Sequence, residues 1–354
     1  MLRTTLVFAL TLALGAGLAA AATAPAGGYH LAGSIAIGGT GGWDYLTVDA
    51  PAHRLYVSHA SRVEVVDTAT GTLVGAIPDT PGVHGIALAP VLDRGYISDG
   101  RAGTVTVFDL KTLKVLATIA VTGANPDAIV FEPVTRRVFT FNGSGRNITA
   151  IDTATNEVAG TIELGAKPEF AVADGTGTVF FNLETTSELG VLDARTLKVT
   201  ARWPLAPGEE PTGLALDIAH RRLFSVCGNQ LMVVTDADSG RVVATLPIGR
   251  GVDGAAFDPE TGDAFASAGE GVLTVVHEDS ADTFTVAATV PTARGARTVA
   301  LDTATHRLYL PTARFGAPPA AERGQRHRRR PSVVPGTFEV LVVERESAPA
   351  AAKQ

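Results

Sequence analysis

The sequence predicts an all-β fold, a seven-bladed β-propeller built from four-stranded blades. Its 354 residues include 38 Gly and 20 Pro but only 18% charged residues, a turn-rich composition that disfavours long helices. A short apolar segment that ends in an acidic residue recurs along most of the chain. Each copy stands among four short runs typical of β-strands. Together these observations exclude a helical bundle or a coiled coil.

The recurring segment sets the number of blades. It reads Val63–Asp67 in the first copy, and the seven copies end at Asp67, Asp109, Asp152, Asp193, Asp236, His277 and Glu344. Consecutive ends are 41 to 43 residues apart, except that the last follows its predecessor by 67. Four strands in a unit of about 42 residues is the pattern of a propeller blade, so seven copies predict seven blades. The last unit must then contain an insertion of about 25 residues.

The strands of each unit follow from runs of four to six apolar residues between turn residues. In the second unit these runs are Gly85–Leu88, Gly95–Ser98, Thr104–Phe108 and Val115–Ile119. The run Leu31–Ile37 resembles a fourth strand, whereas the final unit ends after its third strand at Glu344. We therefore expect Leu31–Ile37 to complete the last blade, because closing the ring removes exposed sheet edges.

The second strands carry a family resemblance. They read Tyr56-Val57-Ser58-His59, Tyr96-Ile97-Ser98-Asp99, Phe139-Thr140-Phe141-Asn142 and Tyr309-Leu310-Pro311-Thr312. With turns such as Asp67-Thr68-Ala69-Thr70-Gly71, the chain resembles the YVTN-repeat, YncE-like family of exported bacterial β-propellers over residues 30–345. The resemblance implies the propeller fold but no single reaction, because the repeated motif is structural. It also implies that some relatives bind nucleic acid or partner proteins, and that distant propellers include lactonases and lyases.

The N-terminus has the pattern of a secretory signal. Arg3 precedes the apolar run Leu6–Ala22, which ends in four alanines and is shorter than the roughly 20 residues that a membrane span needs. We expect residues 1–22 to be a cleaved signal peptide and the protein to be periplasmic or secreted. We expect a monomer with no transmembrane segment in the mature chain, a single propeller at 23–346 and a disordered tail at 347–354. The sole cysteine, Cys227, excludes a disulfide framework and is expected to be buried.

Comparing the repeats separates structural from functional polar residues. The aspartates that end the third strands recur before tight turns and are expected to cap those turns. By contrast, one position at the start of each innermost strand changes its residue type from blade to blade. Turn capping would predict one repeated type there. We expect the following residues to form a ligand-binding site at the channel mouth: Asp44, His84, Asp127, Glu169, Thr212, Asp253 and Arg297.

A second set of candidates lies where second strands lead into third strands. We expect these loops to open on the same face, so that the site also includes His59, Asp99, Asn142 and Glu184. Trp43, which directly precedes Asp44, is expected beside the same mouth. Trp43 is open to two interpretations, since it either stacks on a flat ligand or packs between blades.

The acidic ring also suggests a metal site. Oxygen-rich sets favour Ca²⁺, Mg²⁺ or Mn²⁺, and an imidazole shifts the preference toward Zn²⁺. The candidate ligands of such a divalent cation are His84, Asp127, Glu169 and Asp253. The alternative is a hydrated polar channel without a dedicated ion.

The insertion in the last unit, residues 313–336, is a basic, proline-containing arm. It has six arginines and one glutamate, a formal charge of +5, whereas the whole chain has −7. Three alternatives remain open: a lid over the acidic mouth, a binding site for nucleic acid, membrane or another anionic partner, and a solvated loop. The arginines in question are Arg323, Arg326, Arg328, Arg329 and Arg330.

Three functions are compatible with these patterns. The sequence has no nucleophile elbow, zincin motif, Walker A loop or EF-hand. The first hypothesis is an exported module that binds a small ligand or a protein through the channel mouth. The alternatives are a metal-dependent enzyme of the lactonase or lyase type, and weak nucleic-acid binding through the arm.

Overall fold

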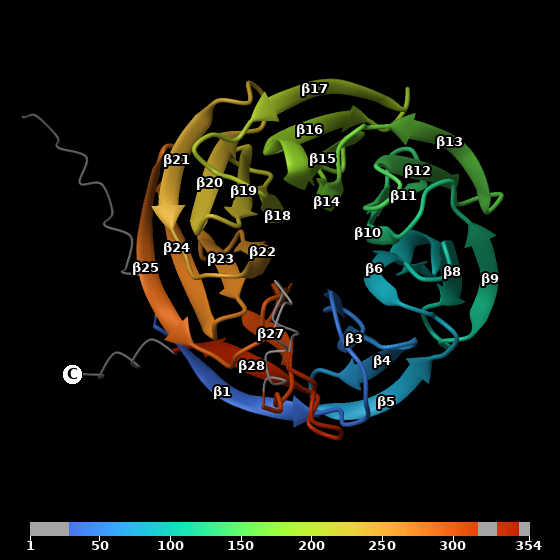
Figure 1. The fold of residues 1–354 in the computed structure, drawn as a ribbon, viewed down its shortest axis with the longest axis horizontal. Helices are drawn as coiled ribbons and strands as arrows, with labels where there is room; N and C mark the ends of the chain where they lie inside the picture. The colour runs from blue at the N-terminus through green and yellow to red at the C-terminus, as the bar shows by residue number, and fades with distance from the viewer. Residues whose placement is uncertain (1–27, 318–330, 347–354) are drawn as a thin grey trace, which may run out of the picture.

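The computed structural model describes residues 28–317 and 331–346. They form seven four-stranded antiparallel sheets arranged in a ring around a central axis (Figure 1). The expected seven-bladed β-propeller is therefore confirmed. The expected signal peptide (1–22), the C-terminal tail (347–354) and the five arm arginines between 323 and 330 lie outside the described residues.

Blades 1 to 6 follow one another along the chain, each running from an innermost to an outermost strand. Blade 1 contains β2 (Leu46–Asp49), β3 (Arg54–His59), β4 (Arg62–Asp67) and β5 (Thr72–Ile77). Blade 2 contains β6 (Val83–Ala89), the 3-10 turn η1 (Pro90–Leu92), β7 (Arg94–Asp99), β8 (Thr104–Asp109) and β9 (Val115–Ala120). Blade 3 contains β10 (Pro126–Glu132), β11 (Arg137–Asn142), β12 (Asn147–Asp152) and β13 (Glu157–Glu163).

The second half of the ring repeats this order. Blade 4 contains β14 (Pro168–Ala173), β15 (Thr178–Leu183), the 3-10 turn η2 (Glu184–Thr186), β16 (Glu188–Asp193) and β17 (Lys198–Pro204). Blade 5 contains β18 (Pro211–Asp217), β19 (Arg222–Cys227), β20 (Leu231–Asp236) and β21 (Val242–Pro247). Blade 6 contains β22 (Val252–Asp258), β23 (Asp263–Ala268), β24 (Val272–Ser280) and β25 (Thr283–Pro291).

Blade 7 joins the two ends of the chain. Its strands are β26 (Ala300–Asp302), β27 (Arg307–Thr312), β28 (Glu339–Arg345) and β1 (Tyr29–Ala36), in the order β26-β27-β28-β1. Strand β1 pairs antiparallel with β28, from Tyr29 opposite Arg345 to Ala36 opposite Glu339 (Figure 1). The N-terminal strand thus completes the last blade, as the sequence predicted.

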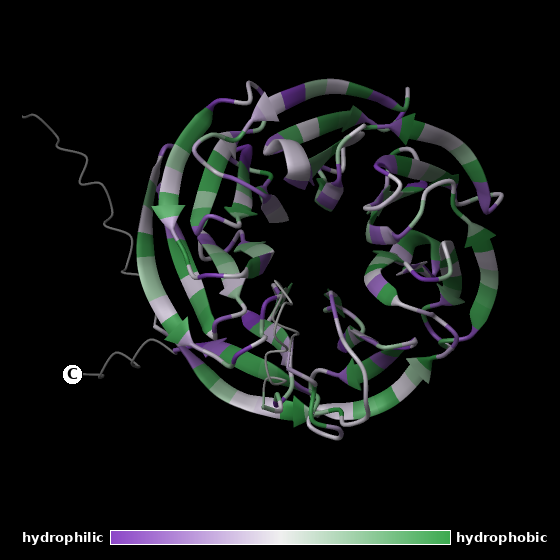
Figure 2. Cartoon of the chain, in the orientation of Figure 1, coloured by the Kyte–Doolittle hydropathy of each residue, from purple (hydrophilic) through white to green (hydrophobic). Residues whose placement is uncertain are grey.

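The apolar core lies between the blades. Seven clusters of buried residues occur in the described chain, one at each interface between neighbouring blades. The rings of Phe141 and Phe181, for example, lie 5.4 Å apart between blades 3 and 4. Apolar residues follow the strands of every blade, whereas hydrophilic residues mark many of the loops (Figure 2). Residues that face the channel are therefore free of the main packing role.

The predicted turn caps are present. Each aspartate that ends a third strand in blades 1 to 5 accepts hydrogen bonds from the backbone N–H groups two and three residues later. At Asp67 and Asp109 these bonds lower the carboxyl pKa. Among the described residues, no helix is long and apolar enough to cross a membrane.

Candidate functional site

The structure brings together the seven residues predicted at the channel mouth. Six of them line one cavity of about 400 Å³, which we call the acidic well: Asp44, Asp127, Glu169, Thr212, Asp253 and Arg297. The seventh, His84, lines an adjoining cavity of about 400 Å³ together with Asp44 and Arg297. The seven residues predicted from the repeats therefore line two adjoining cavities, although they come from seven separate blades.

An aromatic contact crosses the channel at the well. Tyr45 precedes β2 in blade 1, and its ring centroid lies 5.0 Å from that of Phe170 in β14 of blade 4. Tyr45 is buried and lines the acidic well. Burial and the negative charges of Asp127, Asp44, Asp253 and Glu169 raise the pKa of its phenol well above the usual value. Four carboxylates from four blades therefore surround one neutral phenol.

The mouth residues are linked by ion pairs. His84 Nδ1 donates to Asp44 Oδ2 at 2.6 Å and lies 3.6 Å from Asp127 Oδ1. Arg297 donates through Nε to Asp253 at 2.6 Å and through Nη2 to Asp44 at 3.3 Å. Asp44 thus pairs with both His84 and Arg297, and Asp253 pairs with Arg297 of the next blade.

Lys167 belongs to the well although the sequence comparison did not identify it. Its ammonium pairs with Glu169 and lies 2.6 Å from Glu184. Burial disfavours the charge, but these two carboxylates outweigh it and raise the lysine pKa. Lys167 directly precedes Pro168 and Glu169, two residues before the position that was compared between blades. A comparison of neighbouring positions for added charges would have found it.

Several residues at the mouth have raised pKa values and therefore bind protons more readily than usual. Burial is the largest cause that raises the pKa of Asp127 to about 7, and the charges of Asp44 and Asp253 add to it. Burial and the charge of Asp127 raise the pKa of Glu169 to about 8. Burial opposes the protonation of His84, but its bond to Asp44 and the charge of Asp127 prevail and raise its pKa to about 9. The imidazole is therefore a cation at neutral pH.

Only part of the predicted metal set comes together. Single ligand atoms of Asp44, His84 and Asp127 lie within 4.8 Å of one another. Glu169 and Asp253, the other two predicted ligands, pair with Lys167 and Arg297 instead. His84 also holds a proton and hydrogen-bonds Asp44. A metal would have to displace this proton, because an imidazole coordinates through a free nitrogen lone pair.

Three of the second set of candidates lie inside the blades instead of opening on the mouth face. His59, Asp99 and Asn142 are buried. His59 lies 3.3 Å from Glu64 and packs against the Phe338 ring, Asp99 accepts bonds from Thr104 and Thr106, and Asn142 donates to Asn147 and Thr149. The expectation was wrong for these residues because they are the last members of buried second strands.

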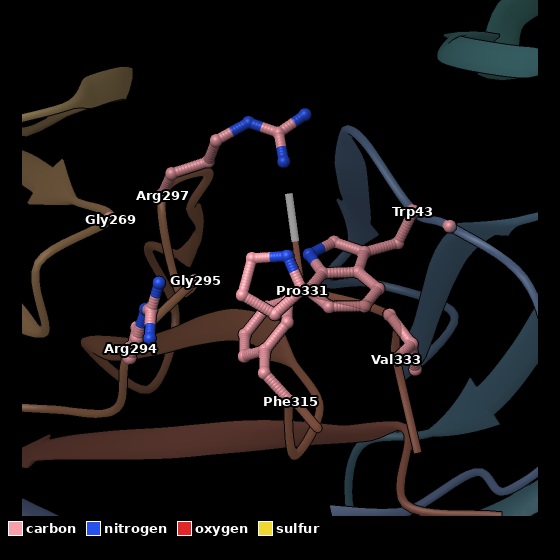
Figure 3. Close-up of a pocket in the computed structure, with 9 residues that line it drawn as sticks. Trp43, Gly269, Arg294, Gly295, Arg297, Phe315, Pro331 and Val333 are labelled. Atoms are coloured by element: carbon pink, nitrogen blue, oxygen red, sulfur yellow. The ribbon is translucent and has the colours of Figure 1, made fainter. Parts of the chain in front are cut away.

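The remaining two candidates do face the mouth. Glu184 lines the acidic well beside Lys167. Trp43 lines a further cavity of about 550 Å³, which we call the arginine–aromatic cavity. There its ring lies 6.1 Å from that of Phe315, and the guanidinium of Arg294 stands 5.6 Å from the centre of the Phe315 ring (Figure 3). Arg297 lines both cavities and separates the well from the aromatic side.

Trp43 has one of the two roles that the sequence left open, packing between blades, because its ring stacks on the buried Phe338 at 5.2 Å. Its ring also borders the cavity, and stacking on a ligand stays a prediction. Phe315 and Val333, which form a β-bridge at the base of the arm, line the same cavity. Cys227 is buried, and burial raises its thiol pKa to about 12, so it is not a nucleophile at neutral pH.

Comparisons with known proteins give distant relatives. No family model matches the chain. It aligns with the uncharacterized protein YncE of Salmonella typhi and of Salmonella typhimurium, in both cases at 25% identity over 223 residues. The chain is a weak homologue of YncE. The alignment covers 56% of this chain and 61% of each relative, so it spans less than two thirds of their length.

Solved structures show the same fold at low sequence identity. The RRP9 WD40 repeats match with a TM-score of 0.73 and 9% identity, covering 88% of this chain and 97% of that one. U3-55K matches with a TM-score of 0.73 and 10% identity, covering 89% and 99%. Kuenenia stuttgartiensis hydrazine synthase matches with a TM-score of 0.64 and 16% identity, covering 77% and 92%. These likenesses concern the propeller fold and not its activity.

Proposed function

We propose that this protein is a binding module whose acidic well receives a cationic side chain, a lysine or an arginine, of a peptide or protein partner. One observation carries the proposal. Asp127 Oδ1 is buried and has no hydrogen-bond partner within the described residues. Leaving a buried carboxylate oxygen unpaired is costly, and an N–H donor from a ligand removes that cost.

The charge balance of the mouth favours the same ligand. Three cationic groups, His84, Lys167 and Arg297, share the mouth with five carboxylates: Asp44, Asp127, Glu169, Glu184 and Asp253. Burial is the largest cause of the raised pKa values of Asp127 and Glu169, and repulsion from neighbouring carboxylates, which these cations do not fully offset, adds to it. A ligand ammonium or guanidinium relieves this repulsion.

The shape of the mouth favours a peptide segment over an isolated ion. A well of about 400 Å³ accommodates a long side chain, and the arginine–aromatic cavity begins on the other side of Arg297. Trp43, Phe315 and Arg294 there offer surfaces for an aromatic or acidic neighbour of the basic residue. The engagement of Glu169 and Asp253 by Lys167 and Arg297 supports this function over a metal-dependent reaction at the mouth.

The test compares four short peptides that differ only in a central Lys, Arg, Gln or Glu, titrated calorimetrically into the protein. We expect the Lys and Arg peptides to bind about ten-fold or more tightly than the Gln and Glu peptides. The control variant Glu270→Gln changes an acid outside the well, which pairs with Arg250, and should bind like the wild type. Equal affinity for all four peptides, or a preference for Glu, would overturn the proposal.

A further inference from the structure

A second polar cluster lies away from the mouth, between blades 5 and 6. Asp217 ends β18, His220 follows it in the turn before β19, and Glu278 lies on β24 of the next blade. One ligand-type atom from each of these residues lies within 4.8 Å of the others. Asp217 and His220 are turn residues of kinds that recur in other blades, so Glu278 is the feature that sets this cluster apart.

Glu278 breaks a repeated structural pattern. It directly follows the last residue of the recurring segment, and its backbone N–H donates to the turn carbonyl of Gly262 in its own blade. The equivalent residues of blades 1 to 5 make the same backbone bond, are buried and carry no charge: Thr68, Leu110, Thr153, Ala194 and Ala237. Blade 6 thus places a carboxylate where five other blades place an uncharged side chain.

This carboxylate is buried, and the imidazole of His220 is the nearest group of opposite character. The Glu278 side chain is 2% exposed, and neither of its oxygens has a hydrogen-bond partner within the described residues. The nearby guanidinium of Arg222 is engaged elsewhere, by Asp236 at 2.9 Å and by Asp282 at 3.2 Å. A buried carboxylate without a hydrogen bond is strongly unfavourable, so an ionised Glu278 requires a cation beside it.

The geometry around Glu278 suits a metal ion. His220 Nδ1 lies 2.9 Å from Glu278 Oε1 and 2.9 Å from Asp217 Oδ2, so one imidazole nitrogen faces both carboxylates. Asp217 is oriented by the backbone N–H groups of Ala219 and His220. Ligands at about 2.1 Å from a metal and at right angles to one another stand about 3 Å apart, which matches both contacts.

We propose that Asp217, His220 and Glu278 form a binding site for a divalent transition-metal ion, such as Zn²⁺ or Mn²⁺. Two carboxylates and one imidazole are ligands of this class, and water completes the coordination. The His220 side chain is 55% exposed, which opens the site to solvent. Because the ligands come from two blades, a bound ion joins blade 5 to blade 6 and stabilises the ring by mass action.

The experiment uses chelator-treated, tag-free full-length protein, titrated with ZnCl₂ and with MnCl₂ by calorimetry and by thermal unfolding. We expect one equivalent to bind and to raise the unfolding temperature. Glu278→Gln and His220→Gln should each weaken binding by about ten-fold or more. His53→Gln, at a comparable turn in blade 1, and Asp127→Asn, at the mouth, should leave this binding unchanged.

Three results would overturn the site. They are wild-type affinity in both Glu278→Gln and His220→Gln, loss of the equivalent only in Asp127→Asn, and no saturable binding below about 1 mM metal. Circular dichroism of each variant confirms folding before titration. His220 is half-exposed, so its variant keeps the test valid even where a core substitution unfolds the protein. The peptide titrations at the mouth are carried out on the same chelator-treated protein without added metal, so their failure is independent of this result.

Discussion

The ring of Tyr45 in blade 1 lies 5.0 Å from the ring of Phe170 in blade 4, on another part of the propeller. Most apolar packing joins neighbouring blades, whereas this contact joins two blades that are separated by two others. Tyr45 therefore ties the ring together through its channel and also forms a wall of the acidic well. Structure and site depend on the same side chain.

Tyr45 should be important for stability through its ring and not through its hydroxyl. Tyr45→Ala is expected to lower the free energy of unfolding by about 3–5 kcal/mol, because it removes a buried aromatic ring. Tyr45→Phe keeps that ring and should cost about 1 kcal/mol or less. Denaturant unfolding of both variants measures the difference. A cost below about 1 kcal/mol for Tyr45→Ala would show that the contact is not structural.

His84 should stabilise the protein below pH 9 and lose that effect above it. Its folded-state pKa of about 9 exceeds the ordinary value of 6.5, so protonation favours the folded state fully below pH 6.5 and progressively less up to about pH 9. Wild type should therefore exceed His84→Gln in stability by about 1–3 kcal/mol at pH 6, after allowance for solvent screening. The gap should close by pH 10. A constant gap across this range would contradict the assignment.

Binding of a cationic peptide should strengthen as the pH rises. The carboxyls of Asp127 and Glu169 have raised pKa values of about 7 and about 8, so part of each population is protonated at neutral pH. A cation favours the ionised forms, and its binding must release protons. Affinity for the lysine peptide should increase between pH 6 and pH 8.5. Titrations in two buffers with different ionisation enthalpies count the protons, and a pH-independent affinity would contradict this mechanism.

Lys167 should compete with the ligand. Its ammonium already occupies Glu169 and Glu184, so Lys167→Gln frees two carboxylates for the incoming cation. We expect the lysine peptide to bind this variant about three- to ten-fold more tightly than wild type. Lys111→Gln, which removes an exposed lysine paired with Asp93, is the matched control and should have no effect. Weaker binding of the lysine peptide by Lys167→Gln would contradict a competition between Lys167 and the ligand cation for these carboxylates.

The fold was predictable from the sequence because the strand pattern of each blade repeats at a regular spacing. The 41–43-residue spacing of residues such as Asp67 and Asp109 set the blade number, and the unpaired run Leu31–Ile37 indicated how the ring closes. The same periodicity singled out Asp44, His84 and Asp127, since a position that varies among fixed neighbours does not serve the repeated turn or the common core. These residues follow from local pattern and ring symmetry alone.

The rest of the site depends on where side chains point. His59, Asp99 and Asn142 have polar side chains, but the structure buries them in bonds within their own blades. The contact of Tyr45 with Phe170 depends on the width of the channel, which no repeat encodes. Glu278, by contrast, was accessible to the sequence comparison, because the residue after each third strand is uncharged in blades 1 to 5. The comparison at the start of the innermost strands did not include this position after the third strands.

Titration of the central-lysine peptide into wild type and into Asp127→Asn tests the central claim most directly. The asparagine keeps the size of the side chain and removes the charge whose buried oxygen is unpartnered. We predict that the variant folds, because it relieves carboxylate repulsion, and that it binds the peptide about ten-fold or more weakly than wild type. Equal affinity in the two proteins would contradict the assignment of the acidic well as the site that receives a cationic side chain.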